Sequence, residues 1–202
     1  YEAGFKQQHA LSIRGNEHKL DWSLALGYDR NVSALDAVNS RLNLTTKNTL
    51  RFTDGLSLDF GAMYTHTKNQ QGRSDYSDLA TTGFLYPYLR LRNQQGAELG
   101  IPRTYSLSYL NSLNPFVFAD WNYYPLSDFS NNKLENASNH LLLQTALNYR
   151  LANGLSARIH YQYEMQTANI YSLYGTNSFM VRNLYNTYTQ VGTNGEVTRV
   201  VP

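Results

Sequence analysis

Two groups of side chains have the chemistry to bind a ligand, and the first is an aromatic run. Trp121, Tyr123 and Tyr124 fall within the segment Asp120-Trp121-Asn122-Tyr123-Tyr124. Aromatic rings can stack on the apolar face of a sugar, and neighbouring carboxylate and amide groups can hydrogen-bond its hydroxyls. Rings that pack in a core, or that anchor a strand where it enters lipid, have the same pattern. The run is therefore a candidate substrate-binding site. Packing in a core or anchoring at the membrane surface is nevertheless the favoured interpretation of its rings.

The second group is a polar stripe near the middle of a patterned segment. Arg158, His160, Gln162 and Glu164 occupy alternate positions, so an extended strand would point all four in the same direction. Charged and amide groups in such a row could contact a polar solute. The interior of a barrel is also generally polar for structural reasons alone. Arg158, His160 and Glu164 are therefore candidate substrate contacts, with a purely structural polar lining as the simpler alternative.

Other kinds of site are not indicated by the sequence. There is no cysteine, and no metal-ligand spacing links the five histidines, which are His9, His18, His66, His140 and His160. Nucleophile-elbow, phosphate-loop and dinucleotide motifs are absent, and Asp75, Asp78 and Glu98 fit solvated loop charges. A net charge of +2 without a basic cluster argues against nucleic-acid binding. We expect neither an enzyme nor a metal or cofactor site.

The elements that would position these side chains are strands, and the segment 141–165 gives the clearest hairpin. Along both of its arms, every second residue is mostly apolar and the intervening residues are mostly polar or charged. This alternation predicts two strands with one apolar and one polar face, joined by a turn at Asn153-Gly154. Each arm is about eleven residues long, the length at which a tilted strand crosses the hydrocarbon of a bilayer.

The same alternation recurs earlier in the chain, most clearly where one row comprises Leu20, Trp22, Leu24, Leu26 and Tyr28. Together the patterns predict six antiparallel strands at about 8–14, 19–30, 41–53, 56–67, 140–151 and 155–166. Tight turns are expected at about 15–17 and at Asp54-Gly55. Residues 68–139 would form a long loop. A second loop, 167–202, could contain a short helix or turn at 177–186.

The lengths of the connections also alternate, so that short turns share one end of the strands and long loops share the other. This asymmetry is typical of outer-membrane barrels, which have short periplasmic turns and long extracellular loops. No run approaches the roughly 18 apolar residues of a membrane helix. We therefore predict an all-β fold: antiparallel up-and-down strands of a transmembrane β-barrel, with residues 1–202 part of one barrel domain. A chain that starts at Tyr1 without a leader-like segment is expected to be a fragment.

Several short segments also have a recognisable order and spacing. They are Leu85-Tyr86-Pro87-Tyr88, Asp120-Trp121-Asn122-Tyr123-Tyr124-Pro125-Leu126, Tyr149-Arg150-Leu151 with Gly154-Leu155, Tyr161-Gln162-Tyr163-Glu164, Arg182-Asn183-Leu184-Tyr185-Asn186 and Tyr188-Thr189-Gln190. From about Leu11 to the end, the chain resembles the SusC/RagA family of TonB-linked outer-membrane transporters. Tyr185 stands where that family is expected to have an aliphatic residue.

The resemblance implies a segment of a TonB-dependent transporter in the outer membrane of a Gram-negative bacterium. Such a protein imports glycan or peptide fragments beneath a SusD-like lipoprotein, and contacts TonB through regions that this chain lacks. Loop 68–139, rich in aromatic and proline residues, is expected to form an ordered cap that contacts the ligand or the lipoprotein. Two alternatives remain: a soluble all-β carbohydrate-binding module, whose apolar rows would form a sandwich core, and a non-transporting outer-membrane barrel.

Overall fold

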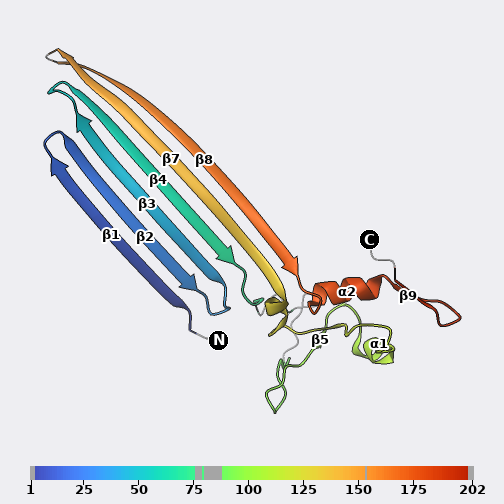
Figure 1. The fold of residues 1–202 in the computed structure, drawn as a ribbon. Helices are drawn as coiled ribbons and strands as arrows, with labels where there is room; N and C mark the ends of the chain where they lie inside the picture. Colours follow the sequence, from blue (N-terminus) through green and yellow to red (C-terminus); the bar gives the residue numbers. More distant parts are fainter. Residues whose placement is uncertain (1–2, 76–78, 80–87, 153, 200–202) are drawn as a thin grey trace. The chain divides into compact units, whose positions relative to one another are not determined.

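The computed structural model describes residues 3–75, 79, 88–152 and 154–199 (Figure 1). The chain divides into two compact units. The first, here called the sheet unit, comprises Tyr1–Gln70 and Glu135–Ile170. The second, here called the loop unit, comprises Gln71–Leu134 and Tyr171–Pro202. Each is described separately below.

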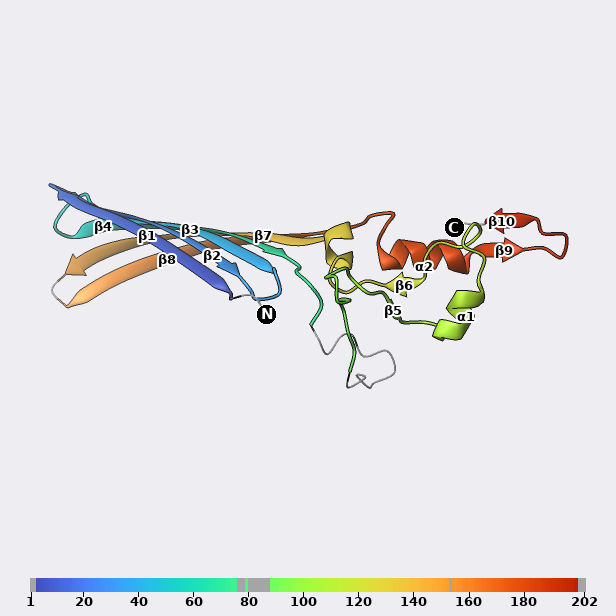
Figure 2. The ribbon, with the colours of Figure 1, turned by 90° about the horizontal axis from the view of Figure 1, so that it is seen from below.

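The sheet unit is a single antiparallel sheet in which the strands follow one another up and down. Their order is β1-β2-β3-β4-β7-β8, so every strand pairs with its nearest long neighbour in sequence. The bounds are Phe5–Glu17, Leu20–Val32, Val38–Arg51, Leu56–Gln70, Asn132–Ala152 and Leu155–Tyr174. The predicted all-β, antiparallel up-and-down arrangement is thus confirmed. The described sheet is open, with β1 and β8 at its edges, and Figure 2 shows that these two strands run in visibly different directions because the sheet is twisted.

Several strands are longer than predicted, most of all β7 and β8. The apolar alternation ends near the predicted bounds, but the backbone ladder continues past it. Lys68 still pairs with Ala137 and Gln70 with Glu135, and an ion pair of 3.2 Å joins the Lys68 ammonium to the Glu135 carboxylate. Backbone hydrogen bonds need no apolar side chains, so period-two hydrophobicity underestimates strand length. The connection predicted at 68–139 therefore shrinks to 71–131, and the loop predicted at 167–202 starts only after Tyr174.

The register of the strands gathers the apolar rows on one side of the sheet, here called the apolar face. Leu26 lies opposite Leu11 on β1 and Leu44 on β3, Leu44 lies opposite Tyr64, and Tyr64 lies opposite Leu141. Much of this face is open in the described chain: Leu11 is 58% exposed and Leu26 41%. The intervening residues form the opposite side, here called the polar face.

Short and long connections sort to opposite ends of the strands, as the sequence predicted (Figure 1). One tight turn falls at 52–55, around the predicted Asp54-Gly55, and another follows Ala152, where Gly154 has φ +85°. The other half of that predicted turn, Asn153, lies outside the described residues. The first turn was misplaced: β1 continues through Gly15, and the chain reverses at His18, where φ is 45°. Within the strand, Gly15 lies opposite Trp22, whose indole is only 2.7 Å from where a Cβ at position 15 would stand, so a side chain there would collide with it.

The loop unit is ordered by short elements around a small core. Its elements are β5 (Ile101–Pro102), α1 (Leu107–Ser112), β6 (Asn122–Tyr123), η2 (Asp128–Asn131), α2 (Phe179–Thr187), β9 (Thr189–Val191) and β10 (Val197–Arg199). Leu79, Ile101 and Tyr123 are buried together, with Leu89, Leu91 and Phe179 packed against them. The helix considered at 177–186 exists as α2. Among the described residues, no helix is long and apolar enough to cross a membrane.

Candidate functional site

The six candidate ligand contacts belong to two different units. Trp121, Tyr123 and Tyr124 lie in the loop unit, and Arg158, His160 and Glu164 lie on β8 in the sheet unit. The structure therefore gives two surfaces to consider rather than one constellation. One of the segments that carry the family resemblance is Leu85-Tyr86-Pro87-Tyr88. Its first three residues lie outside the described part of the chain.

Trp121 and Tyr123 are core residues of the loop unit. Only 7% of Trp121 and 5% of Tyr123 is exposed. The indole Nε1 of Trp121 donates to the Asn183 side-chain oxygen at 2.7 Å, and its ring centroid lies 4.8 Å from that of Tyr105. The ring of Tyr123 packs edge-on against Phe179 at 5.4 Å. Their burial supports the packing interpretation, because neither ring presents a free face on which a sugar could stack.

Tyr124 is half-buried, and its hydroxyl already has a partner. It donates to a carboxylate oxygen of Asp120 at 2.6 Å. This hydrogen bond, followed by burial, raises the pKa of Tyr124 to about 12 from its ordinary value of 10.0. The bond therefore contributes its full stability below pH 10 and loses it as the pH rises through about 12. At neutral pH this phenol is a fixed internal donor.

The segment 119–124 is held by α2, about sixty residues further along the chain. Arg182 donates to the backbone carbonyls of Asp120 and, at 3.0 Å, of Asn122. Asn186, which is almost fully buried, exchanges two 2.8 Å hydrogen bonds with the backbone N–H and C=O of Ala119. Two of the segments quoted for the family resemblance are thus direct partners in the fold.

The start of α2 is fixed by two further buried polar groups. Ser178 is the N-cap and accepts from the Val181 N–H at 3.3 Å, and Asp128 accepts from the Phe179 N–H at 2.6 Å. A hydroxyl and a carboxylate at a helix N-terminus satisfy amides that have no partner within the helix. Ser178, Arg182 and Asn186 were not predicted from the sequence as anchors. Their spacing by four was the available signal, since it places them on one side of a helix.

Replacing Arg182 by lysine is expected to loosen α2 from the segment 119–124. One nitrogen of the arginine, Nη1, donates to two backbone carbonyls of that segment, and Nε donates at 3.1 Å to the Asn177 carbonyl. A lysine ammonium is a single nitrogen and cannot keep this geometry, so we expect a loss of about 1–3 kcal/mol from the loop unit. Limited proteolysis of the intact protein should then cut near Asp120 faster than in the unmodified protein. The exposed Arg90 is the matched control, and Arg90→Lys should leave the cleavage rate unchanged; equal cleavage of R182K and R90K would contradict the anchoring role.

The polar face contains a hollow of about 790 Å³ toward the end that carries the short turns. All six strands line it, and its lining includes the charged residues Arg14, Asp21, Lys47, Asp59 and Arg158 as well as His160. Arg158 lies 3.7 Å from a carboxylate oxygen of Asp59, which also accepts from Asn148 at 2.9 Å and from Thr49 at 2.8 Å. The hollow is therefore lined by charged and amide side chains, including the ion pair between Arg158 and Asp59.

Only part of the predicted stripe reaches this hollow. Arg158 and His160 line it, whereas Glu164 accepts from His140 at 2.7 Å further along β8. Gln144 donates to Gln162 at 3.1 Å, which confirms that the even-numbered rows of β7 and β8 share the polar face. The hollow also contains three residues from other strands of the same sheet, which are Asp59, Arg14 and Lys47. The sequence showed them only as members of polar rows.

Comparison with known proteins adds nothing to this geometry: no model of a protein family matches the chain, and no curated protein is significantly similar to it. Within the described part of the chain, no three His, Cys, Asp or Glu side chains are grouped so that they could hold a metal ion. The arrangement on the polar face can bind polar or charged groups through ion pairs and amide hydrogen bonds.

Proposed function

We propose that this chain forms part of the wall of a transmembrane β-barrel in a TonB-dependent outer-membrane transporter of the SusC/RagA type. The observation that carries the proposal is the apolar face. Between the rows of Trp22 and Tyr28, the residues paired across β1, β2, β3, β4 and β7 on this face include no Asp, Glu, Lys or Arg. A surface of this kind, backed by a polar face, fits a barrel with lipid outside and water or protein inside.

The height of the apolar face fits the hydrocarbon of an outer membrane. From Leu20 to Tyr28 the strand advances eight residues, which at about 3.3 Å each and a tilt of about 40° corresponds to ~20 Å along the barrel axis. Lipid-facing bands of outer-membrane barrels are about 25 Å tall. Aromatic side chains mark both margins, with Tyr28 and Tyr64 toward the loops and Tyr149 toward the turns.

The transport function rests on the family resemblance together with the sorting of the connections. With short turns on the periplasmic side, the loop unit would lie on the outside of the cell. There it would contact the imported glycan or peptide fragment or the SusD-like lipoprotein. The TonB contact would come from other parts of the protein. The polar hollow with Arg158 and His160 would face the interior of the barrel.

A soluble carbohydrate-binding module fits the chain less well. In such a module the apolar face would be the inside of a sandwich, covered by a second sheet. The described residues supply only the small sheets β5–β6 and β9–β10 besides the main one, and Ile13 and Leu24 are 48% and 42% exposed. A non-transporting outer-membrane barrel shares every feature of the sheet unit and differs only in activity.

The direct test uses the complete protein in its own bacterium. Membrane fractionation should place it in the outer membrane, and it should migrate faster on gels when unboiled, as folded barrels do. Deletion of the gene should abolish growth on at least one member of a panel of oligosaccharides and peptides supplied as sole carbon source. Recovery in a soluble fraction would favour the carbohydrate-binding module, and unchanged growth on the whole panel would favour a barrel without transport.

Two exposed rings of the loop unit are the residues through which we expect contact with ligand or lipoprotein. Tyr88 is 93% exposed and Phe116 94%. Aromatic side chains are over-represented among the residues that contribute most to binding at interfaces. The double variant Tyr88→Ser, Phe116→Ser should reduce uptake or lipoprotein co-purification about tenfold or more, because each ring can contribute ~1 kcal/mol or more. The protein should remain heat-modifiable; unchanged uptake and co-purification would exclude these rings as contacts.

A further inference from the structure

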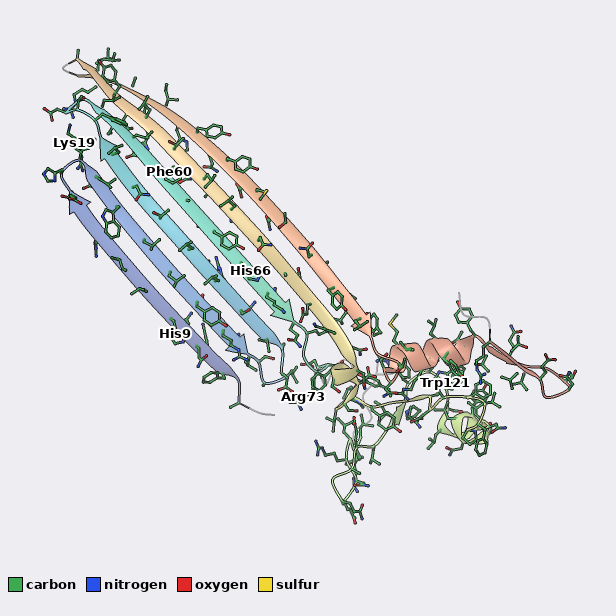
Figure 3. All side chains as sticks on the ribbon, in the orientation of Figure 1. His9, Lys19, Phe60, His66, Arg73 and Trp121 are labelled. Atoms are coloured by element: carbon green, nitrogen blue, oxygen red, sulfur yellow. The ribbon has the colours of Figure 1, made fainter. Side chains whose placement is uncertain are left out.

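A basic pair lies on the apolar face immediately beyond its margin at the loop-bearing end. The last uncharged row passes through Tyr28, Leu42 and His66, and the next row contains Arg30, Ser40 and Lys68 as cross-strand partners. Figure 3 shows His9 and His66, both in the last uncharged row, toward one end of the sheet, with Phe60 nearer the other. Arg30, Ser40 and Lys68 are here called the basic rim.

Arg30 is an exposed arginine with no ion pair in the described part of the chain. Its strand neighbour Asp29 points to the polar face, where it lies opposite Arg41. No carboxylate is therefore paired with it across the strands: its partners are Gln7 on β1 and Ser40 on β3. The guanidinium has its planar set of donors available for an external acceptor.

Lys68 is two strands away on the same row. With neighbouring strands about 4.8 Å apart, the Cα atoms of Arg30 and Lys68 are roughly 10 Å apart. Both side chains are long enough to reach one group placed between them. The Lys68 ammonium pairs with Glu135 at 3.2 Å, but its side chain is 45% exposed. One carboxylate uses only part of its three donors. The Ser40 hydroxyl lies between the two basic residues.

We propose that the basic rim binds the phosphate group of a phosphorylated glycolipid in the outer leaflet. This inference rests on the proposed function, which places the loop-bearing end at the cell surface. The lipid phosphate lies where hydrocarbon gives way to headgroups, and the basic rim lies one row beyond the uncharged band. A basic residue near an anionic membrane surface contributes about 1 kcal/mol, equivalent to about fivefold in affinity. Arginine and lysine on one row match a phosphate in both charge and height.

The experiment compares the unmodified complete protein with the double variant Arg30→Gln, Lys68→Gln. Both are reconstituted into phosphatidylcholine vesicles containing either diphosphoryl lipid A or its dephosphorylated form, and bound lipid A is counted by native mass spectrometry. Competition with free inorganic phosphate separates recognition of the lipid from recognition of the anion alone. Arg41→Gln is the matched control, because Arg41 lies at nearly the same height but on the polar face.

The unmodified protein and R41Q should retain phosphorylated lipid A, and the double variant should bind it about 25-fold more weakly, about fivefold for each residue. Dephosphorylated lipid A should bind the three proteins equally. Equal retention of phosphorylated lipid A by all three, or full displacement by inorganic phosphate, would overturn the proposed lipid site while leaving the barrel intact. Failure of the unmodified protein to insert, read from the absence of a heat-modifiable band, would overturn both the lipid site and the proposed function.

Discussion

Leu24→Arg is expected to remove most of the folded protein from the outer membrane. Leu24 lies inside the uncharged band of the apolar face, opposite Ile13 on β1 and Thr46 on β3, one row from the Trp22 margin and two rows from the Tyr28 margin. In the proposed barrel its side chain faces the lipid near mid-bilayer, where an arginine costs about 2–4 kcal/mol. The measurement is the yield of heat-modifiable protein in the outer-membrane fraction, together with the denaturant midpoint of the reconstituted protein.

Ala25→Arg is the control for that experiment. Ala25 is the next residue along β2 and points to the polar face, where its partners Ser12 and Thr45 carry no charge. An arginine there can reach water or polar side chains, so we expect nearly normal yield. Equal damage from L24R and A25R would mean that the apolar face does not meet lipid, and the barrel proposal would lose its main support.

Asn186→Ala is expected to have the largest effect within the loop unit. The substitution removes both hydrogen bonds to Ala119 and leaves the backbone N–H and C=O of that residue without their partner. Each unsatisfied buried polar group costs about 1–3 kcal/mol, so a total of about 2–6 kcal/mol is expected for the two groups. Hydrogen exchange followed by mass spectrometry should show faster exchange at Ala119 and across α2, with the strands of the sheet unit unchanged.

The control is Asn194→Ala in the exposed turn between β9 and β10. The Asn194 side chain hydrogen-bonds to the side chain and the backbone N–H of Glu196, within the same turn, so its loss should accelerate exchange only there. Normal exchange at Ala119 in N186A would contradict the role assigned to the buried amide. The loop unit would then be held mainly by the packing of Trp121 and Tyr123.

The polar face shows how much of a site depends on register. Arg158 and His160 could be assigned to one row from sequence because alternation along a strand is a local property. The partners of Arg158 could not, since Asp59 is about a hundred residues away and reaches it only because β4 and β8 both pair with β7. If the strands paired in a different order, Arg158 and His160 would still share one row of β8, but other charged residues would lie next to them.

The strands, their two faces, the turn at Asp54-Gly55 and the sorting of short and long connections could all be predicted from the residues alone. Each of these follows from the period of two along the chain or from turn residues, both of which are local. Three features became visible only in the folded chain: the burial of Trp121 and Tyr123, the anchoring of α2 by Asn186 and Asp128, and the extension of β7 and β8 beyond their apolar rows. The physical reason is that burial and buried hydrogen bonds depend on partners far apart in sequence, and ladder pairing depends on backbone groups that all residue types share.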